Sequence, residues 1–140
     1  MSICRFPAYV VSVISYARRC RRDRGVNPIL GHEKLDVYQL SIQFLALARR
    51  VVKKLPRGNA DLADQLTRAS RSIPLNIAEG AGKTTPAHRA RYWGDARGSA
   101  MECAACFDVL REEELIESAD FTKGKELLER IVAMPTKMCR

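Results

Sequence analysis

The sequence predicts an all-α protein, an antiparallel up-down four-helix bundle, and three observations lead to that prediction. Apolar residues recur every three or four positions in four stretches of the chain, which is the period of an amphipathic helix. Short connections separate the stretches; the first contains Pro56 and Gly58, and the second contains Gly80 and Gly82, residues that break helices. Outside the N-terminal segment no stretch has convincing strand character. Four such helices bury their apolar faces by packing together.

The chain divides into a basic N-terminal extension, residues 1–31, and a bundle domain, residues 32–140. Of the net charge of +8, residues 1–28 supply six Arg and one Asp, a balance of +5. Two interpretations of the extension stay open: a flexible basic arm, or upstream sequence included by a wrongly chosen start. Its apolar stretch Ala8–Ala17 is shorter than the ~20 residues that cross a bilayer.

The first helix is predicted from Leu35 to the break at residues 56–58. Two adjacent apolar seams run along it, which is wider than one neighbouring helix covers, so this helix has neighbours on two sides. The first seam is Val37, Leu40, Phe44, Leu47 and Val51, and the second is Tyr38, Ile42, Leu45 and Val52.

The second helix starts near Asn59 or Asp61, both good N-caps, and stops at residues 80–82. Its apolar face is Leu62, Leu66, Ala69, Ile73 and Ile77. Pro74 lies inside it and removes one backbone donor, so we expect a bend there.

The third helix starts at Thr85, a capping hydroxyl, followed by Pro86 at the first helical position. Its predicted inward seam is Tyr92, Ala96, Ser99, Cys103, Cys106 and Leu110. Gly94 and Gly98 leave a bare strip where another backbone can approach closely.

The fourth helix is expected to be capped by Asp120 and to kink or end early at Pro135. Its apolar residues are Leu127, Leu128, Ile131, Val132 and Met138.

Three ordered motifs resemble those of the 23S rRNA intervening-sequence protein family. Residues 71–80 (RSIPLNIAEG) resemble its signature, residues 32–39 (HEKLDVYQ) its first-helix start and residues 96–102 (ARGSAME) a third-helix motif. The likeness covers roughly residues 32–134. Leu75 departs from the small polar residue usual in the family, and Pro135 from an aliphatic one.

The resemblance implies a bundle that self-assembles, as a ring-like homopentamer, and no enzymatic activity. Some family members are encoded within insertions in bacterial 23S rRNA genes. Similar bundles are accessory proteins of diversity-generating retroelements, which bind a reverse transcriptase and nucleic acid. The motif residues to which we assign a structural role are Ser72, Pro74, Asn76, Glu79, Gly80, Gly98, Ser99 and Glu102.

Three groups invite a chemical interpretation that the pattern disfavours. Residues 80–85 (GAGKTT) are not a P-loop, because Ile77 stands where that motif needs Gly and a helix precedes the loop. Cys103 and Cys106 lie on the inward seam, where thiols act as small hydrophobes, and no metal or cofactor site is predicted. Asn76 and Glu79 lack a nucleophile, so their expected role is to satisfy backbone groups near Pro74, with Glu102 pairing Arg68 or Arg71.

A cluster of basic residues is the candidate nucleic-acid-binding surface: Arg49, Arg50, Lys53, Lys54, Arg57, Arg68 and Arg71. Such groups contact phosphate and carry no base information. A solvated face is the structural alternative. We therefore expect a non-enzymatic homo-oligomer that binds RNA or DNA, or alternatively a protein-binding scaffold or accessory subunit. The five Cys without framework spacing favour a reducing, cytoplasmic location.

Overall fold

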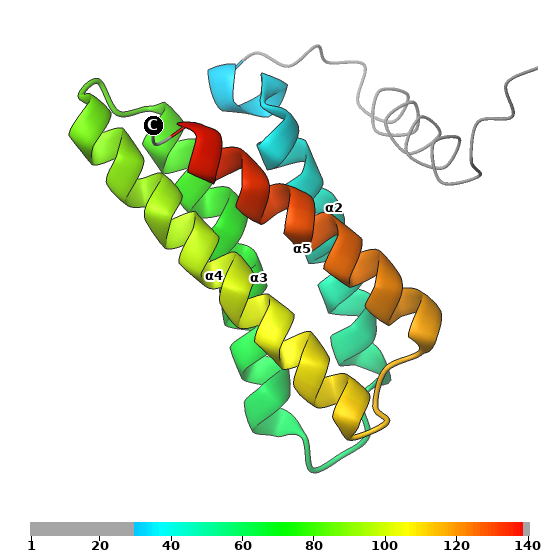
Figure 1. Cartoon of the computed structure of the whole chain (residues 1–140). Coiled ribbons are helices and arrows are strands. Elements are labelled where there is room, and N and C mark those ends of the chain that lie inside the picture. The colour runs from blue at the N-terminus through cyan, green and yellow to red at the C-terminus, as the bar shows by residue number, and fades with distance from the viewer. Residues whose placement is uncertain (1–29, 139–140) are drawn as a thin grey trace, which may run out of the picture.

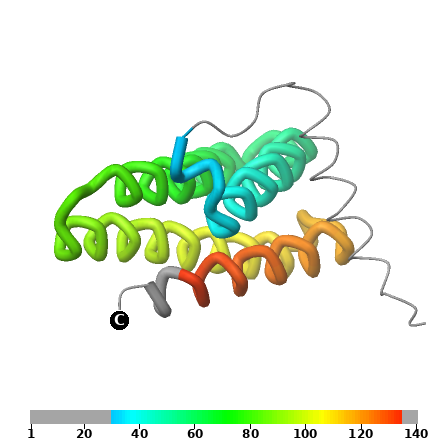
Figure 2. The backbone as a smooth tube through the Cα atoms, turned by 90° about the horizontal axis from the view of Figure 1, so that it is seen from above, coloured from blue at the N-terminus to red at the C-terminus, as the bar shows by residue number. Residues whose placement is uncertain are grey.

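The computed structural model describes residues 30–138, with side chains through residue 134. A short 3-10 helix, η1 (Gly31–Lys34), leads into four long helices: α2 (Asp36–Lys54), α3 (Ala60–Ala81), α4 (Pro86–Glu112) and α5 (Ser118–Met138). Each helix packs against the next, and α5 returns to pack against α2 (Figure 1). Seen from above, α2 and α3 form one layer, and α4 and α5 form the other (Figure 2). The predicted four-helix bundle is confirmed.

The core forms where the predicted apolar seams meet. The entire first seam of α2 is buried, and its second seam is half-buried. Phe44 of α2 meets Phe107 of α4 at a ring-centroid distance of 5.5 Å, and both side chains are fully buried. The buried aliphatic residues of α3 and α5 are Leu66, Ala69, Ile73, Ile77, Leu127, Leu128 and Ile131.

The inward face of α4 differs from the predicted seam. Trp93, Ala100 and Phe107 are buried beside the predicted Ala96, Cys103, Cys106 and Leu110. Tyr92 and Ser99, which the sequence placed inside, are half-buried. The error arises because α4 is apolar on two faces, so that its periodicity does not identify which face points inward.

The N-termini of the helices follow the sequence signals in part. Thr85 caps α4, since its hydroxyl accepts a hydrogen bond from the His88 backbone N–H at 3.4 Å. Asn59 is the N-cap residue of α3 as predicted, but its side-chain amide donates to the Pro56 carbonyl instead of capping. The prediction for Asp120 was wrong, because α5 begins at Ser118 and Asp120 lies in its first turn. A carboxylate in the first turn still interacts favourably with the helix dipole.

Neither internal proline ends its helix. α3 runs unbroken through Pro74, which is buried, and the bend there stays a prediction. α5 continues to Met138, so an early end at Pro135 was wrong, and the alternative of a kink there stays a prediction. A proline removes one backbone donor and crowds one carbonyl, and the residues on either side keep their helical conformation here.

Two glycines lie where one helix comes very close to an aromatic side chain of another. A Cβ built at Gly80 of α3 would lie 2.7 Å from Cδ1 and Nε1 of Trp93. A Cβ built at Gly124 of α5 would overlap the ring of Phe107, with Cδ1 at 2.7 Å and Cζ at 2.9 Å. Both glycines therefore make room for the rings that join α4 to its two neighbours.

Candidate nucleic-acid interface

The seven predicted basic residues lie in the α2–α3 layer. The last two turns of α2 contain Arg49, Arg50, Lys53 and Lys54. Positive charge there interacts favourably with the helix dipole. Arg57 lies in the turn that follows, and Arg68 and Arg71 lie on α3. All seven residues are exposed.

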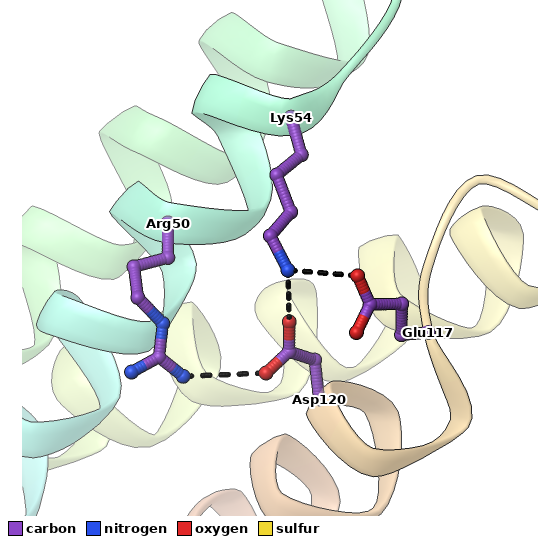
Figure 3. A network of polar contacts seen from close by, with 4 residues as sticks. All are labelled: Arg50, Lys54, Glu117 and Asp120. Carbon is purple, nitrogen blue, oxygen red and sulfur yellow. Dashed lines mark hydrogen bonds and ion pairs between the residues drawn. The ribbon is translucent and has the colours of Figure 1, made fainter.

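Two of the seven are held by acidic residues at the start of α5 (Figure 3). The Lys54 ammonium donates to Glu117 Oε1 at 2.9 Å and to Asp120 Oδ2 at 3.3 Å. The Arg50 guanidinium donates to Asp120 Oδ1 at 3.2 Å. The hydrogen bonds to Glu117 and then to Asp120 raise the pKa of Lys54. Arg50 and Lys54 thus tie α2 to α5, and their charge is largely compensated.

The other five cations make no ion pair within residues 30–138: Arg49, Lys53, Arg57, Arg68 and Arg71. Arg49 and Lys53 are one turn apart on α2, rotated by about 100° from Arg50 and Lys54. Two exposed carboxylates, Asp61 and Asp64, lie on the first turns of α3. We call the five unpaired cations, Arg49, Lys53, Arg57, Arg68 and Arg71, the open basic surface.

The signature motif of α3 is used to pair helices. The Asn76 amide donates to the Ser72 hydroxyl at 2.9 Å, and Ser99 Oγ of α4 lies 3.0 Å from Ser72 Oγ. Ser99 Oγ also lies 3.0 Å from the carbonyl oxygen of Asp95. Asn76 therefore bonds a side chain and not the backbone near Pro74, which corrects that expectation. The arrangement fixes α3 against α4.

Glu102 also differs from its prediction. Its carboxylate accepts a hydrogen bond from the Gln65 amide at 3.3 Å, and not from Arg68 or Arg71. Because Gln65 satisfies the carboxylate across the α3–α4 contact, both arginines remain in the open basic surface.

Glu79 lies in the last turn of α3, next to the connection to α4. It accepts a hydrogen bond from Lys83 at 3.2 Å, and the hydrogen bond from Tyr92 is the main cause of its lowered pKa. The Lys83 ammonium lies 4.8 Å from the centroid of the Tyr92 ring. The segment that looked like a P-loop is thus a helix–helix turn, with its lysine engaged by a carboxylate and an aromatic ring.

The two cysteines of α4 are buried, and burial raises the pKa of both thiols. A buried protonated thiol is a poor nucleophile. Among the described residues, no group of three or more His, Cys, Asp and Glu side chains could hold a metal ion.

Two hollows on the bundle are shallow. One, of about 240 Å³, lies beside Lys54 and Asp120, and another, of about 230 Å³, lies beside Arg89 and Trp93. Both are below the ~300–1,000 Å³ typical of small-molecule sites. The outer surface is therefore the better candidate for function. No helix in the described part of the chain has the length and apolar character needed to cross a bilayer.

Sequence reasoning missed most of an apolar strip on the outer face of α4. The strip consists of Gly94, Gly98, Met101, Ala105 and Val109, all exposed. Met101 is 55% exposed and Val109 43%, while Leu75 of neighbouring α3 is 69% exposed. Continuing the three- and four-residue spacing from Gly94 and Gly98 along the sequence would have found it. We call the five residues of α4, from Gly94 to Val109, the α4 strip.

These features define a class: small antiparallel four-helix bundles in which half-buried polar groups join two helices and unpaired cations lie on the outside. The profile of the 23S rRNA-intervening sequence protein family matches residues 33–137, and the chain belongs to that family. The predicted resemblance is therefore confirmed. No catalytic activity is indicated for the family.

A solved structure gives the same fold. It is a protein of unknown function from the S23 ribosomal protein family of Bacteroides thetaiotaomicron VPI-5482, with a TM-score of 0.69 and 19% identity. The match covers 74% of this chain and 98% of that one. None of the curated proteins matches the sequence.

Proposed function

We propose that this chain is a non-enzymatic, homo-oligomeric protein that engages RNA or DNA through its open basic surface. The observation that carries the proposal is the separation of the seven predicted cations. Two are compensated by α5, whereas Arg49, Lys53, Arg57, Arg68 and Arg71 are exposed and unpaired within the described residues.

The chemistry of this surface favours phosphate contacts without strong sequence preference. Guanidinium and ammonium groups bind phosphate oxygens and release counterions, which supplies affinity but reads no bases. Recognition of unpaired bases would need exposed aromatic faces. In the α2–α3 layer, the only Phe, Tyr or Trp outside the buried seam is Tyr38. It is half-buried and packs edge-on against His32, with 4.8 Å between the ring centroids.

No reaction is part of the proposal. The polar side chains that could be considered for catalysis are already engaged: Asn76 bonds Ser72 within α3, while Ser99 and Glu79 make hydrogen bonds between α3 and α4. The proposal keeps the cytoplasmic location favoured by the cysteine pattern.

The test is electrophoretic retardation of structured RNA and duplex DNA at two salt concentrations. If five phosphates are contacted, log K falls with log salt at a slope near −4.5, so affinity drops by about 500-fold between 50 and 200 mM salt. Seven contacts would give a loss nearer 6,000-fold by the same relation. Absence of retardation at the lower salt concentration would refute nucleic-acid binding.

A matched pair of variants tests which cations matter. The double substitution Arg49→Gln and Lys53→Gln should reduce the slope by about 2. The control, Arg50→Gln with Lys54→Gln, removes the same charge from adjacent positions of α2. It should change the slope little, because these cations are already compensated by Glu117 and Asp120. Equal effects of the two pairs would contradict the assignment.

Self-association is the second part of the proposal. It is supported by the α4 strip, because an exposed apolar helix face marks a contact surface. The ring-like pentamer implied by the resemblance stays a prediction, with a mass five times 15.7 kDa. A monomer mass at every concentration would contradict this part alone.

The same strip favours one alternative, a protein-binding scaffold without a nucleic-acid role. In that case, binding of a partner protein would be insensitive to nuclease and to the Arg49→Gln and Lys53→Gln substitutions.

A further inference from the structure

A hollow of about 240 Å³ lies at the end of the bundle where α2 finishes and the chain turns from α4 into α5 (Figure 1). Three apolar side chains, three carboxylates and one cation line it: Val51, Lys54, Glu114, Leu115, Ile116, Glu117 and Asp120. This mixture suits the arginine side chain, because an apolar surface accepts its aliphatic stem while carboxylates attract its cationic head.

The carboxylates around the hollow are only partly compensated. Lys54 is shared between Glu117 and Asp120 (Figure 3). Glu113 and Glu114 are exposed and make no ion pair among the described residues. Both lie just beyond the last residue of α4, where the helix dipole disfavours negative charge. This end of the bundle therefore attracts cations, although the chain as a whole carries a charge of +8.

The backbone of the turn holds one of these carboxylates in place. The Glu114 N–H donates to the Arg111 carbonyl at 3.0 Å, and the Leu115 N–H donates to the Leu110 carbonyl at 2.8 Å. Glycine is usual at the position of Glu114 in a helix end with this pair of bonds, and Glu114 has a φ of 56° there. A carboxylate thus lines the hollow at a position where many helices carry no side chain.

The chain contains a segment of complementary charge within reach of the hollow. Residues 18–24 (RRCRRDR), which lie outside the described residues, carry five Arg and one Asp. Arg18 precedes Leu30 by 12 residues, which span up to about 40 Å when extended. The hollow lies at the far end of α2 from Leu30, and α2 is about 28 Å long. The segment can therefore reach the hollow of its own chain.

We propose that the arginine-rich segment, residues 18–24, docks on this hollow of the same chain. Arginine heads pair with Glu113, Glu114 and Glu117, and their stems pack on Leu115 and Ile116. Each exposed ion pair is weak, so several act together, and the docking is reversible and weakens as salt is added. The contact uses neither the open basic surface nor the α4 strip, so it is independent of the proposed function.

Disulfide trapping locates the segment, because Cys20 lies in its middle. Cys4→Ser and Cys139→Ser form the background of the full-length chain, and the two Cys of α4 are buried. Ser118→Cys, at an exposed position beside the hollow, should form a disulfide with Cys20 several-fold faster than Thr84→Cys. Thr84 is also exposed, but it lies at the opposite end of the bundle, which the extension can reach equally well.

Neutral substitutions test the charge pairing in the Ser118→Cys chain. Glu113→Gln with Glu114→Gln should slow the trapping by roughly two- to thirty-fold, the range for two exposed ion pairs. The matched control, Asp61→Asn with Asp64→Asn, removes the same charge from exposed positions of α3 and should leave the rate unchanged. Circular dichroism verifies that each variant is folded.

Three results would overturn the docking. Equal trapping rates at positions 118 and 84 would mean random collision of the extension with the bundle. A product of only twice 15.7 kDa on a denaturing, non-reducing gel would mean that the segment binds a second copy. Equal rates in the Glu113→Gln, Glu114→Gln variant and its control would remove the arginine–carboxylate contacts. None of these results bears on nucleic-acid retardation, which tests a different surface.

Discussion

Replacing Gly124 by Ala should destabilise the protein, although the same change in an ordinary helix stabilises it. Gly124 lies inside α5, where Ala is favoured over Gly by about 0.8–1.0 kcal/mol. Here, however, the new methyl group would overlap the Phe107 ring. That ring is fully buried and packed against Phe44, so it cannot move aside at low cost. Overpacking of this kind costs up to about 3 kcal/mol, which leaves a net loss of about 2 kcal/mol.

The assay is thermal or urea unfolding followed by circular dichroism. A loss of this size lowers Tm by roughly 8 °C for a chain of this length. Gly98→Ala is the matched control, because Gly98 is also inside a helix but its added Cβ meets nothing within 4 Å. It should stabilise the monomer by about 0.5–1 kcal/mol. If Gly124→Ala were as stabilising as Gly98→Ala, the close approach of α5 to Phe107 would be refuted.

Three further predictions concern polar and thiol groups. The pKa of Glu79, measured by NMR titration, should rise toward its ordinary value in Tyr92→Phe, because the hydrogen bond from the tyrosine hydroxyl is the main cause of its lowered pKa. The stability that ionised Glu79 contributes is present above its ordinary pKa and is lost as the pH falls through its lowered pKa. Cys103 and Cys106 should resist alkylation in the folded protein and react only in denaturant, since burial raises their pKa; peptide mass spectrometry distinguishes them from the other cysteines, and rapid labelling of the native protein would contradict their burial. Asp120→Asn should lower Tm at low salt and less at high salt, because it removes the shared partner of two exposed cations; a salt-independent effect would speak against an ionic origin.

The sequence predicted the four helices well because each depends on local periodicity. Leu40 and Phe44 are buried as their spacing requires, and Thr85 with Pro86 marks the start of α4. Which face of α4 points into the core was not predictable in the same way, because this helix has two apolar faces, one with Trp93 and the other with Met101. Only packing against α3 and α5 decides between them.

For the candidate site, the sequence predicted which cations belong to it but not which of them are paired with carboxylates. The seven cations are visible in the sequence, but the pairing of Arg50 with Asp120 joins residues 70 positions apart. No local pattern separates Arg50 from its neighbour Arg49, although the fold compensates one and leaves the other open. The exchange of Gln65 for Arg68 as the partner of Glu102 has the same origin, because partners across a bundle depend on the relative rotation of two helices.

The diagonal placement of α2 and α4, whose backbones are not neighbours and whose side chains meet through the core, has a consequence for the coupling of the two layers. The contact between the Phe44 and Phe107 rings spans both layers, so shortening one ring should loosen both helices together. Amide hydrogen exchange in Phe44→Leu should therefore become faster in α4 as well as in α2.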